Sequence, residues 1–77
     1  MILTIKDVKT DASKVTEIGN FVVTYTSTEG IEDVVYEVKT FERHKNNIDS
    51  FIQNNLFLSH NQNDALAKYE ETIKSFQ

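Results

Sequence analysis

The 77-residue sequence contains no cysteine, no proline and no tryptophan, and it has only two glycines, Gly19 and Gly30. Without cysteine, neither a disulfide bond nor a thiolate-held metal ion can stabilise the fold. With so little glycine and proline, a flexible linker or a disordered tail is not expected. A chain of this length forms one domain, residues 1–77, which needs tight packing or association with another chain for its stability.

A basic charge balance and a long apolar run are also missing. Twelve acidic and eight basic residues give a formal net charge of −4, whereas binding to a phosphate backbone needs clustered Lys and Arg. The apolar run at the N-terminus is too short for a signal peptide or a membrane span. We therefore expect a cytoplasmic protein that binds neither nucleic acid directly nor a membrane.

The sequence does contain clear hydrophobic periodicity, and the period changes from 2 to about 3.6 near residues 42–45. Before this point, residues 20–26 and 34–41 alternate like two strands of a hairpin, with a turn at Gly30 that can adopt positive φ. The first apolar face of this hairpin consists of Phe21, Val23, Tyr25, Val34, Tyr36 and Val38.

The N-terminal part of the chain gives a weaker pattern. Residues 1–9 are predicted to form a strand. In residues 11–19, the spacing of Ala12, Val15 and Ile18 slightly favours a short helix. The β-branched residues of that segment and the Gly19-Asn20 pair instead favour a strand followed by a two-residue turn.

After the change of period, two helices are predicted. The first has its N-cap at Asn46 or Asn47 and carries the apolar stripe Ile48, Phe51, Ile52 and Leu56. The second begins at Ser59 or Asn61, and its stripe is Leu66, Tyr69, Ile73 and Phe76. The sequence therefore predicts an α+β fold: a three-stranded antiparallel sheet, four-stranded if 11–19 is a strand, followed by two C-terminal helices packed on one face.

The sequence shows no catalytic or phosphate-binding motif. His44 and His60, with nearby carboxylates such as Glu42 and Asp64, are the residues from which a metal-dependent or substrate-binding enzyme could be built. Their spacing does not force three or four ligands to converge, as a metal ion requires. We predict a protein that is not an enzyme and has no catalytic residues, cofactor or metal, and we keep a small enzyme using His44 and His60 as the alternative.

Two features of the sequence indicate a protein interface. The first is surplus apolar surface, because the predicted helices cover only one side of the sheet. It consists of Val22, Val35 and Phe41 on the second face of the hairpin, together with Phe57. The second is an acidic hairpin loop that contains Glu29, Glu32 and Asp33.

These features lead to the main hypothesis of a small interaction protein that acts through protein–protein contacts or homo-oligomerisation. A further hypothesis is that the acidic loop inhibits a nucleic-acid-binding protein by contacting its basic surface. Small acidic chains without cysteine are common among phage and mobile-element proteins, and we expect such a source.

Overall fold

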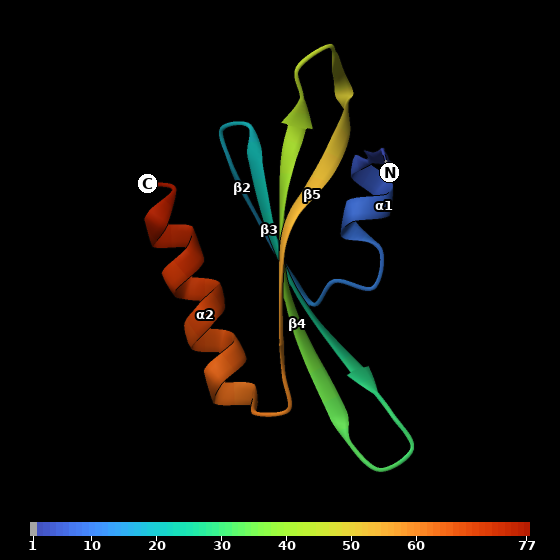
Figure 1. Cartoon of the computed structure of the whole chain (residues 1–77), viewed down its shortest axis with the longest axis vertical. Coiled ribbons are helices and arrows are strands. Elements are labelled where there is room, and N and C mark those ends of the chain that lie inside the picture. The colour runs from blue at the N-terminus through green and yellow to red at the C-terminus, as the bar shows by residue number, and fades with distance from the viewer. Residues whose placement is uncertain (1) are drawn as a thin grey trace.

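The centre of the fold is a long antiparallel hairpin (Figure 1). In the computed structural model, which describes residues 2–77, this hairpin consists of β3 (Phe21–Glu29) and β4 (Val34–His44). The two strands pair without interruption from Phe21 opposite Glu42 to Glu29 opposite Val34. The hairpin predicted from the alternating pattern is confirmed, and both of its strands extend further than the pattern indicated.

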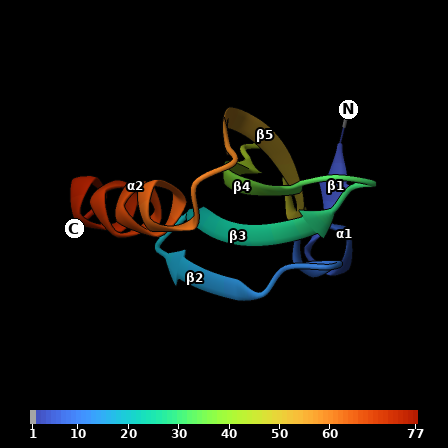
Figure 2. The ribbon, with the colours of Figure 1, turned by 90° about the horizontal axis from the view of Figure 1, so that it is seen from below.

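Within residues 2–77, three more strands and two helices complete the domain. They are β1 (Leu3–Thr4), α1 (Ile5–Lys9), β2 (Lys14–Ile18), β5 (Asn47–Ser59) and α2 (Gln62–Ser75). The strands form one five-stranded antiparallel sheet in the order β1-β5-β4-β3-β2. Figure 2 shows α2 and α1 on opposite sides of the twisted sheet. The α+β class and the antiparallel sheet are confirmed, but the sheet has more strands than predicted and only one C-terminal helix.

The helix α2 covers the first face of the sheet and forms the larger hydrophobic core. Its buried members are Val23, Tyr25, Val38, Ala65 and Tyr69, with Tyr36, Phe57, Leu66, Ile73 and Phe76 packed around them. All four residues of the predicted apolar stripe therefore face this core. The hydroxyl groups of Tyr69 and Thr16 are 2.6 Å apart and join α2 to β2. Asn61 is the N-cap, and its side chain accepts the backbone N–H of Asp64.

The second face of the sheet has a core of its own under α1 and β1. Val8, Val22, Phe41 and Phe51 are buried there, with Leu3, Ile5 and Val15 packed against them. The helix α1 starts with a reciprocal capping box, in which the Thr4 hydroxyl accepts the N–H of Asp7 and the Asp7 carboxylate accepts the N–H of Thr4. The expectation that Val22 and Phe41 lie on an uncovered face is therefore wrong. Residues 5–9 leave the predicted strand and fold over them as a helix.

The helix predicted to begin at Asn46 or Asn47, with its apolar stripe from Ile48 to Leu56, is instead the strand β5. Residues 45 and 46 form a tight turn, and His44 pairs with Asn47. A bulge then shifts the register, because Thr40 pairs with Asn55 whereas Phe41 pairs with Gln53. A bulge inserts one extra residue and interrupts strict alternation. A second irregularity separates the pair of Arg43 with Phe51 from the pair of His44 with Asn47. The steps from Ile48 to Phe51 and from Ile52 to Leu56 each span one of the two irregularities, so these apolar residues are spaced like those of a helix, which explains the wrong prediction.

The segment 11–19 is also a strand, so the alternative interpretation of its sequence is the correct one. The strand β2 pairs with β3 from Lys14 opposite Tyr25 to Ile18 opposite Phe21. Gly19 has φ +58° and occupies the two-residue turn. This conformation favours glycine, which has no Cβ. The slight preference for a helix in this segment is wrong because β-branched residues pack well in a strand paired with β3.

A substitution of Phe41 tests whether the second face of the sheet is buried in solution. We expect Phe41→Ala to lower the free energy of unfolding by about 3–5 kcal/mol, because it removes a buried aromatic ring and leaves a cavity. Leu56→Ala, at a residue that is 49% exposed, should cost less than about 1 kcal/mol. Chemical denaturation of both variants measures the difference. Similar small costs for the two would contradict a buried Phe41.

The ionisation of Asp7 makes the stability of α1 depend on pH. Its pKa lies below its ordinary value, chiefly because the carboxylate accepts the Thr4 backbone N–H, and also through the Thr4 side chain and the Lys6 ammonium. A lowered pKa in the folded state adds stability above the unfolded pKa, and this stability is lost as the pH falls through the folded value. Because the carboxylate is exposed, the effect is small.

We therefore expect Asp7→Asn to increase amide exchange at Val8 at neutral pH, relative to the unmodified chain. The difference should shrink as the pH falls below the ordinary carboxyl pKa of about 4, and it should disappear only below the lower pKa of folded Asp7. Asp33→Asn removes a carboxylate from an exposed loop and serves as the control. A difference between Asp7→Asn and the unmodified chain that persisted in acid would contradict this assignment.

Candidate interaction surface

The acidic loop lies at one end of the molecule, between β3 and β4. Glu29, Glu32 and Asp33 are exposed there, and Ile31 between them is fully exposed. The loop is closed by the Gly30 N–H, which donates to the Asp33 carbonyl. The structure thus brings the three predicted acidic residues together, but it places them far from the buried Val22 and Phe41.

The two histidines lie at opposite ends of the β4–β5 hairpin. His44 is next to the tight turn, whereas His60 follows Ser59, which pairs with Tyr36 at the other end of β4. The eight residue-to-residue steps of strand from position 36 to position 44 span about 26 Å. Two imidazoles separated in this way cannot bind the same ion. Over residues 2–77, no three His, Asp or Glu side chains are grouped as metal ligands.

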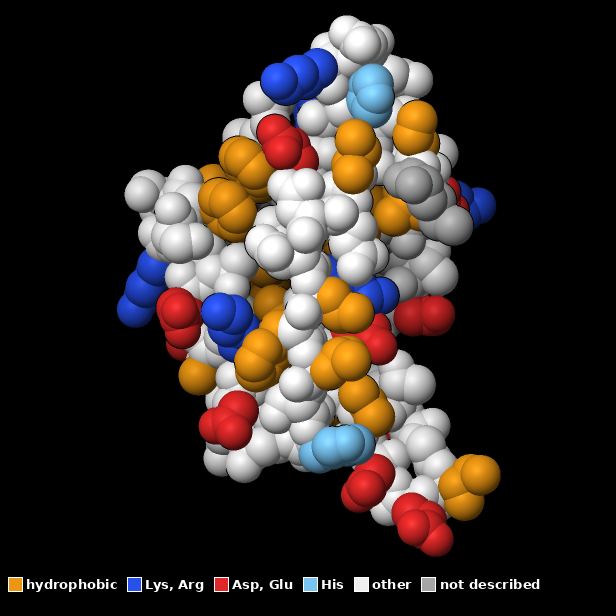
Figure 3. Space-filling view, in the orientation of Figure 1, with side chains coloured by type: hydrophobic (Ala, Val, Ile, Leu, Met, Phe, Trp, Pro, Cys, Tyr) orange, Lys and Arg blue, Asp and Glu red, His pale blue; other side chains and the backbone are white. Residues whose placement is uncertain are grey.

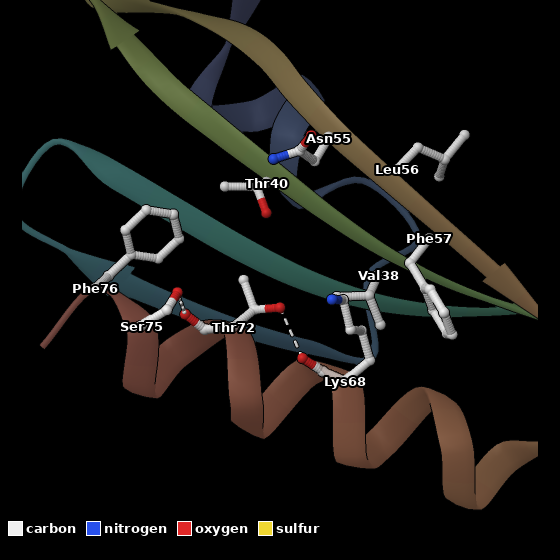
Figure 4. Close-up of a pocket in the computed structure, with 9 residues that line it drawn as sticks. All are labelled: Val38, Thr40, Asn55, Leu56, Phe57, Lys68, Thr72, Ser75 and Phe76. Carbon is white, nitrogen blue, oxygen red and sulfur yellow. Dashed lines mark hydrogen bonds between the residues drawn. The ribbon is translucent and has the colours of Figure 1, made fainter.

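A groove of about 400 Å³ separates α2 from the end of the sheet that contains β4 and β5 (Figure 4). It is lined by Val38, Thr40, Asn55, Leu56, Phe57, Lys68, Thr72, Ser75 and Phe76. The hydroxyl groups of Thr72 and Ser75 donate to carbonyls of the helix, those of Lys68 and Thr72. Lys68 is the only charged residue in this lining, so the groove has no acid–base pair. Three consecutive residues of β5 form one side of it.

The outer edge of β5 is mostly unpaired. The strand β1 pairs with it only at Phe51 and Ser50, opposite Leu3 and Thr4. From Ile52 to Ser59, β5 pairs with β4 on one side, and no other strand of residues 2–77 lies along its second side. A strand edge of this kind leaves backbone N–H and C=O groups free to bind another extended chain.

The direction of these backbone groups follows from the adjacent ladder. The Arg43 N–H donates to the Asn20 carbonyl, so Arg43 directs its backbone groups toward β3. In an antiparallel ladder, successive residues direct these groups to opposite sides. The pairing of β3 with β4 has no register shift, so the odd-numbered residues of β4 direct their backbone groups toward β3, as Arg43 does. The even-numbered residues, including Val38 and Thr40, direct theirs toward β5.

The same alternation identifies the free groups of β5. Phe57 pairs with Val38, so the N–H and C=O of Phe57 point inward, toward β4. Its neighbours Leu56 and Leu58 therefore direct their N–H and C=O groups outward, away from the sheet. These two residues supply the hydrogen-bonding groups that a further strand would use.

The side chains of the same two residues are also exposed. Leu56 is 49% exposed and Leu58 is 54% exposed, and their pairing with Lys39 and Glu37 places them on the α1 face of the sheet. Phe57 points to the α2 face, where the Lys68 ammonium lies 5.9 Å from the centre of its ring. Hydrophobic side chains flank β5 on both sides in Figure 3.

No charged residue occurs in Ser50–Ser59. The other edge strand of the sheet, β2, has only five residues and includes the charged Lys14 and Glu17. Charges and short length are features that protect sheet edges from unwanted pairing. The edge of β5 lacks both, which makes it the candidate interaction surface of this protein.

The chain matches no known family, and no curated protein or solved structure gives a match. Within the part of the chain that the structure describes, neither helix is long and apolar enough to span a bilayer.

The residues predicted for an interface are only partly placed on this surface. Phe57 lies on β5 and is half-buried, and Val35 is half-buried on the same face as the exposed leucines. The sequence pattern misses Leu56 because it assigns this residue to a helix, and it places Leu58 in neither of the two predicted helices. The uncharged run through Ser50–Ser59 is a signal that could have indicated a strand edge.

The exposed leucines should bind a hydrophobic fluorescent dye. We expect the double variant Leu56→Thr and Leu58→Thr to reduce dye fluorescence at least about twofold. Its free energy of unfolding should change by about 1 kcal/mol or less, because threonine retains β propensity and little buried area is lost. The control Ile31→Thr removes an isolated exposed side chain and should leave the fluorescence unchanged. Equal fluorescence for the double variant would show that the leucines form no accessible patch.

Proposed function

We propose that this protein is a non-enzymatic interaction protein that binds an extended polypeptide segment along the outer edge of β5. The observation that supports this is an unpaired edge in which Leu56 and Leu58 expose both their side chains and their backbone hydrogen-bonding groups. In strand addition, backbone hydrogen bonds provide affinity, and alternating side-chain contacts provide specificity.

The surroundings of the edge define the chemistry of the bound segment. On one face, its side chains would contact the exposed leucines, which favours aliphatic or aromatic residues. On the other face, they would contact Phe57 and enter the groove next to α2, whose lining is partly polar. Because the edge itself carries no charge, a segment with few charged residues in the pairing region fits it best.

The acidic loop does not extend this surface along the strand. It follows β3 at the end of the sheet, and His60 borders the same hollow as Glu29 and Asp33. The loop could contact basic residues that flank the bound segment. The proposal does not require this contact, because the binding energy comes from the edge and its leucines.

Selection from a displayed library of random peptides tests strand addition even though the natural partner is unidentified. We expect enriched peptides to be rich in β-branched and aromatic residues and to lose at least about tenfold in affinity for Leu56→Pro. Proline removes the outward N–H of Leu56 without removing a hydrogen bond between β4 and β5. Ile31→Lys, at the fully exposed loop tip, should bind the same peptides normally.

Circular dichroism and the thermal midpoint must show that Leu56→Pro remains folded. Leu58→Lys serves as a second variant, because it keeps the backbone donor and adds a charge to the edge. Peptides that bound Leu56→Pro and Leu58→Lys as well as the unmodified chain would contradict the proposal. A library that yielded no enriched sequence would contradict it too.

A further inference from the structure

We infer that a second copy of this chain can occupy the β5 edge, with the two β5 strands paired antiparallel about a two-fold axis. This inference rests on the proposed function and specifies the partner. A two-fold axis brings the same surface of both copies together, so a surface used in this way must be self-complementary. An antiparallel strand pair has this symmetry, because each residue of one strand meets its counterpart in reverse order.

The directions of the backbone groups select the register. Hydrogen-bonded pairs require residues whose N–H and C=O groups both point outward, and Leu56 and Leu58 meet this condition. Leu56 then pairs with Leu58 of the second copy, and Leu58 pairs with Leu56 of the second copy. Each such pair exchanges two hydrogen bonds, so the contact contains about four. Phe57 lies on the axis and faces Phe57 of the second copy.

This register also matches the side chains. The exposed leucines of both copies meet on the α1 face of the joined sheet, where Leu56 of each copy packs beside Leu58 of the other and both lose part of their contact with water. On the opposite face, the two Phe57 rings lie at a non-hydrogen-bonded position, where side chains come closest and aromatic pairs are favourable. The same residues that leave an apolar surface on one copy thus cover it on the other.

The charge distribution supports a second copy at this edge. Two chains of net charge −4 repel each other, and the repulsion is weakest when they meet at surfaces that carry no charge. The segment Ser50–Ser59 carries no charge. The acidic loop lies beyond the end of the paired region, because Glu29 and Val34 flank it and Tyr36 already pairs with Ser59. Both copies can therefore pair without bringing their acidic loops into the contact.

The paired region is short, since β5 ends at Ser59 and the chain then turns into α2. Interfaces smaller than the standard size are weak and reversible. Self-association should therefore depend strongly on concentration. The dimer joins two five-stranded sheets into one continuous sheet and covers the edge of each.

Sedimentation equilibrium over a wide concentration range tests the inference. We expect the average mass of the unmodified chain to rise from 8.9 kDa toward twice that value as concentration increases. Leu58→Lys should raise the dissociation constant at least about tenfold, because it places a charge opposite Leu56 of the second copy. The matched control Ile31→Lys makes the same chemical change on an exposed loop and should associate like the unmodified chain.

A cross-linking experiment tests the register. The chain has no cysteine, so Phe57→Cys introduces a single thiol that faces its counterpart on the axis. The Cα atoms of such a pair are about 4.5 Å apart, which is within the range of a disulfide bond. We expect oxidation to give covalent dimers at least about tenfold faster than for Ile31→Cys.

These results separate the inference from the proposed function. A mass of one chain at every concentration, or equal cross-linking of Phe57→Cys and Ile31→Cys, would overturn pairing with a second copy. If peptides from the library still bound the β5 edge under those conditions, the proposed function would stand without self-association. If both experiments failed, neither use of the edge would remain.

Discussion

Both faces of the β3–β4 hairpin are apolar, and the rest of the molecule is arranged to cover them. Val22 and Val23 are adjacent in sequence and point to opposite faces, yet both are buried. A domain without disulfide bonds has to achieve this with packing alone. The helix α2 covers one face along most of its length. The helix α1 has only five residues, so together with β1 it covers only part of the other face.

This unequal cover determines where the surface remains apolar. The two cores bury the apolar side chains on both faces of β3 and β4. In contrast, β5 extends beyond the short strand β1 that pairs with it. Leu56 and Leu58 lie in that extension. Their exposure and their outward backbone groups have the same origin, because the elements that could cover this half of the sheet are too short. An added strand would cover part of the leucine side chains and also bind the outward N–H and C=O groups, whether this strand comes from a peptide or from a second copy.

The sequence indicated only a small part of the candidate surface. The pattern correctly placed Val22, Val35 and Phe41 on a face that α2 does not cover. It could not show that residues 5–9 fold as a helix over Val22 and Phe41, because a helix of five residues depends on the apolar core beneath it, which is built from strands distant in sequence. The apolar side chains that stay exposed, Leu56 and Leu58, lie instead on β5. The spacing of the apolar residues in this segment predicts a helix.

Local pattern alone determined the central hairpin, the cysteine-free α+β domain and the last helix with its stripe from Leu66 to Phe76. These features depend on residues close in sequence, whose alternation or helical spacing is uninterrupted. Only the tertiary structure decided between strand and helix for residues 47–59. Two register irregularities, one between Asn47 and Phe51 and one between Gln53 and Asn55, make the spacing of the strand resemble that of a helix, and the pairing partner that resolves the ambiguity is β4. The open edge is a property of the whole sheet, because it exists only where no neighbouring strand is long enough to pair.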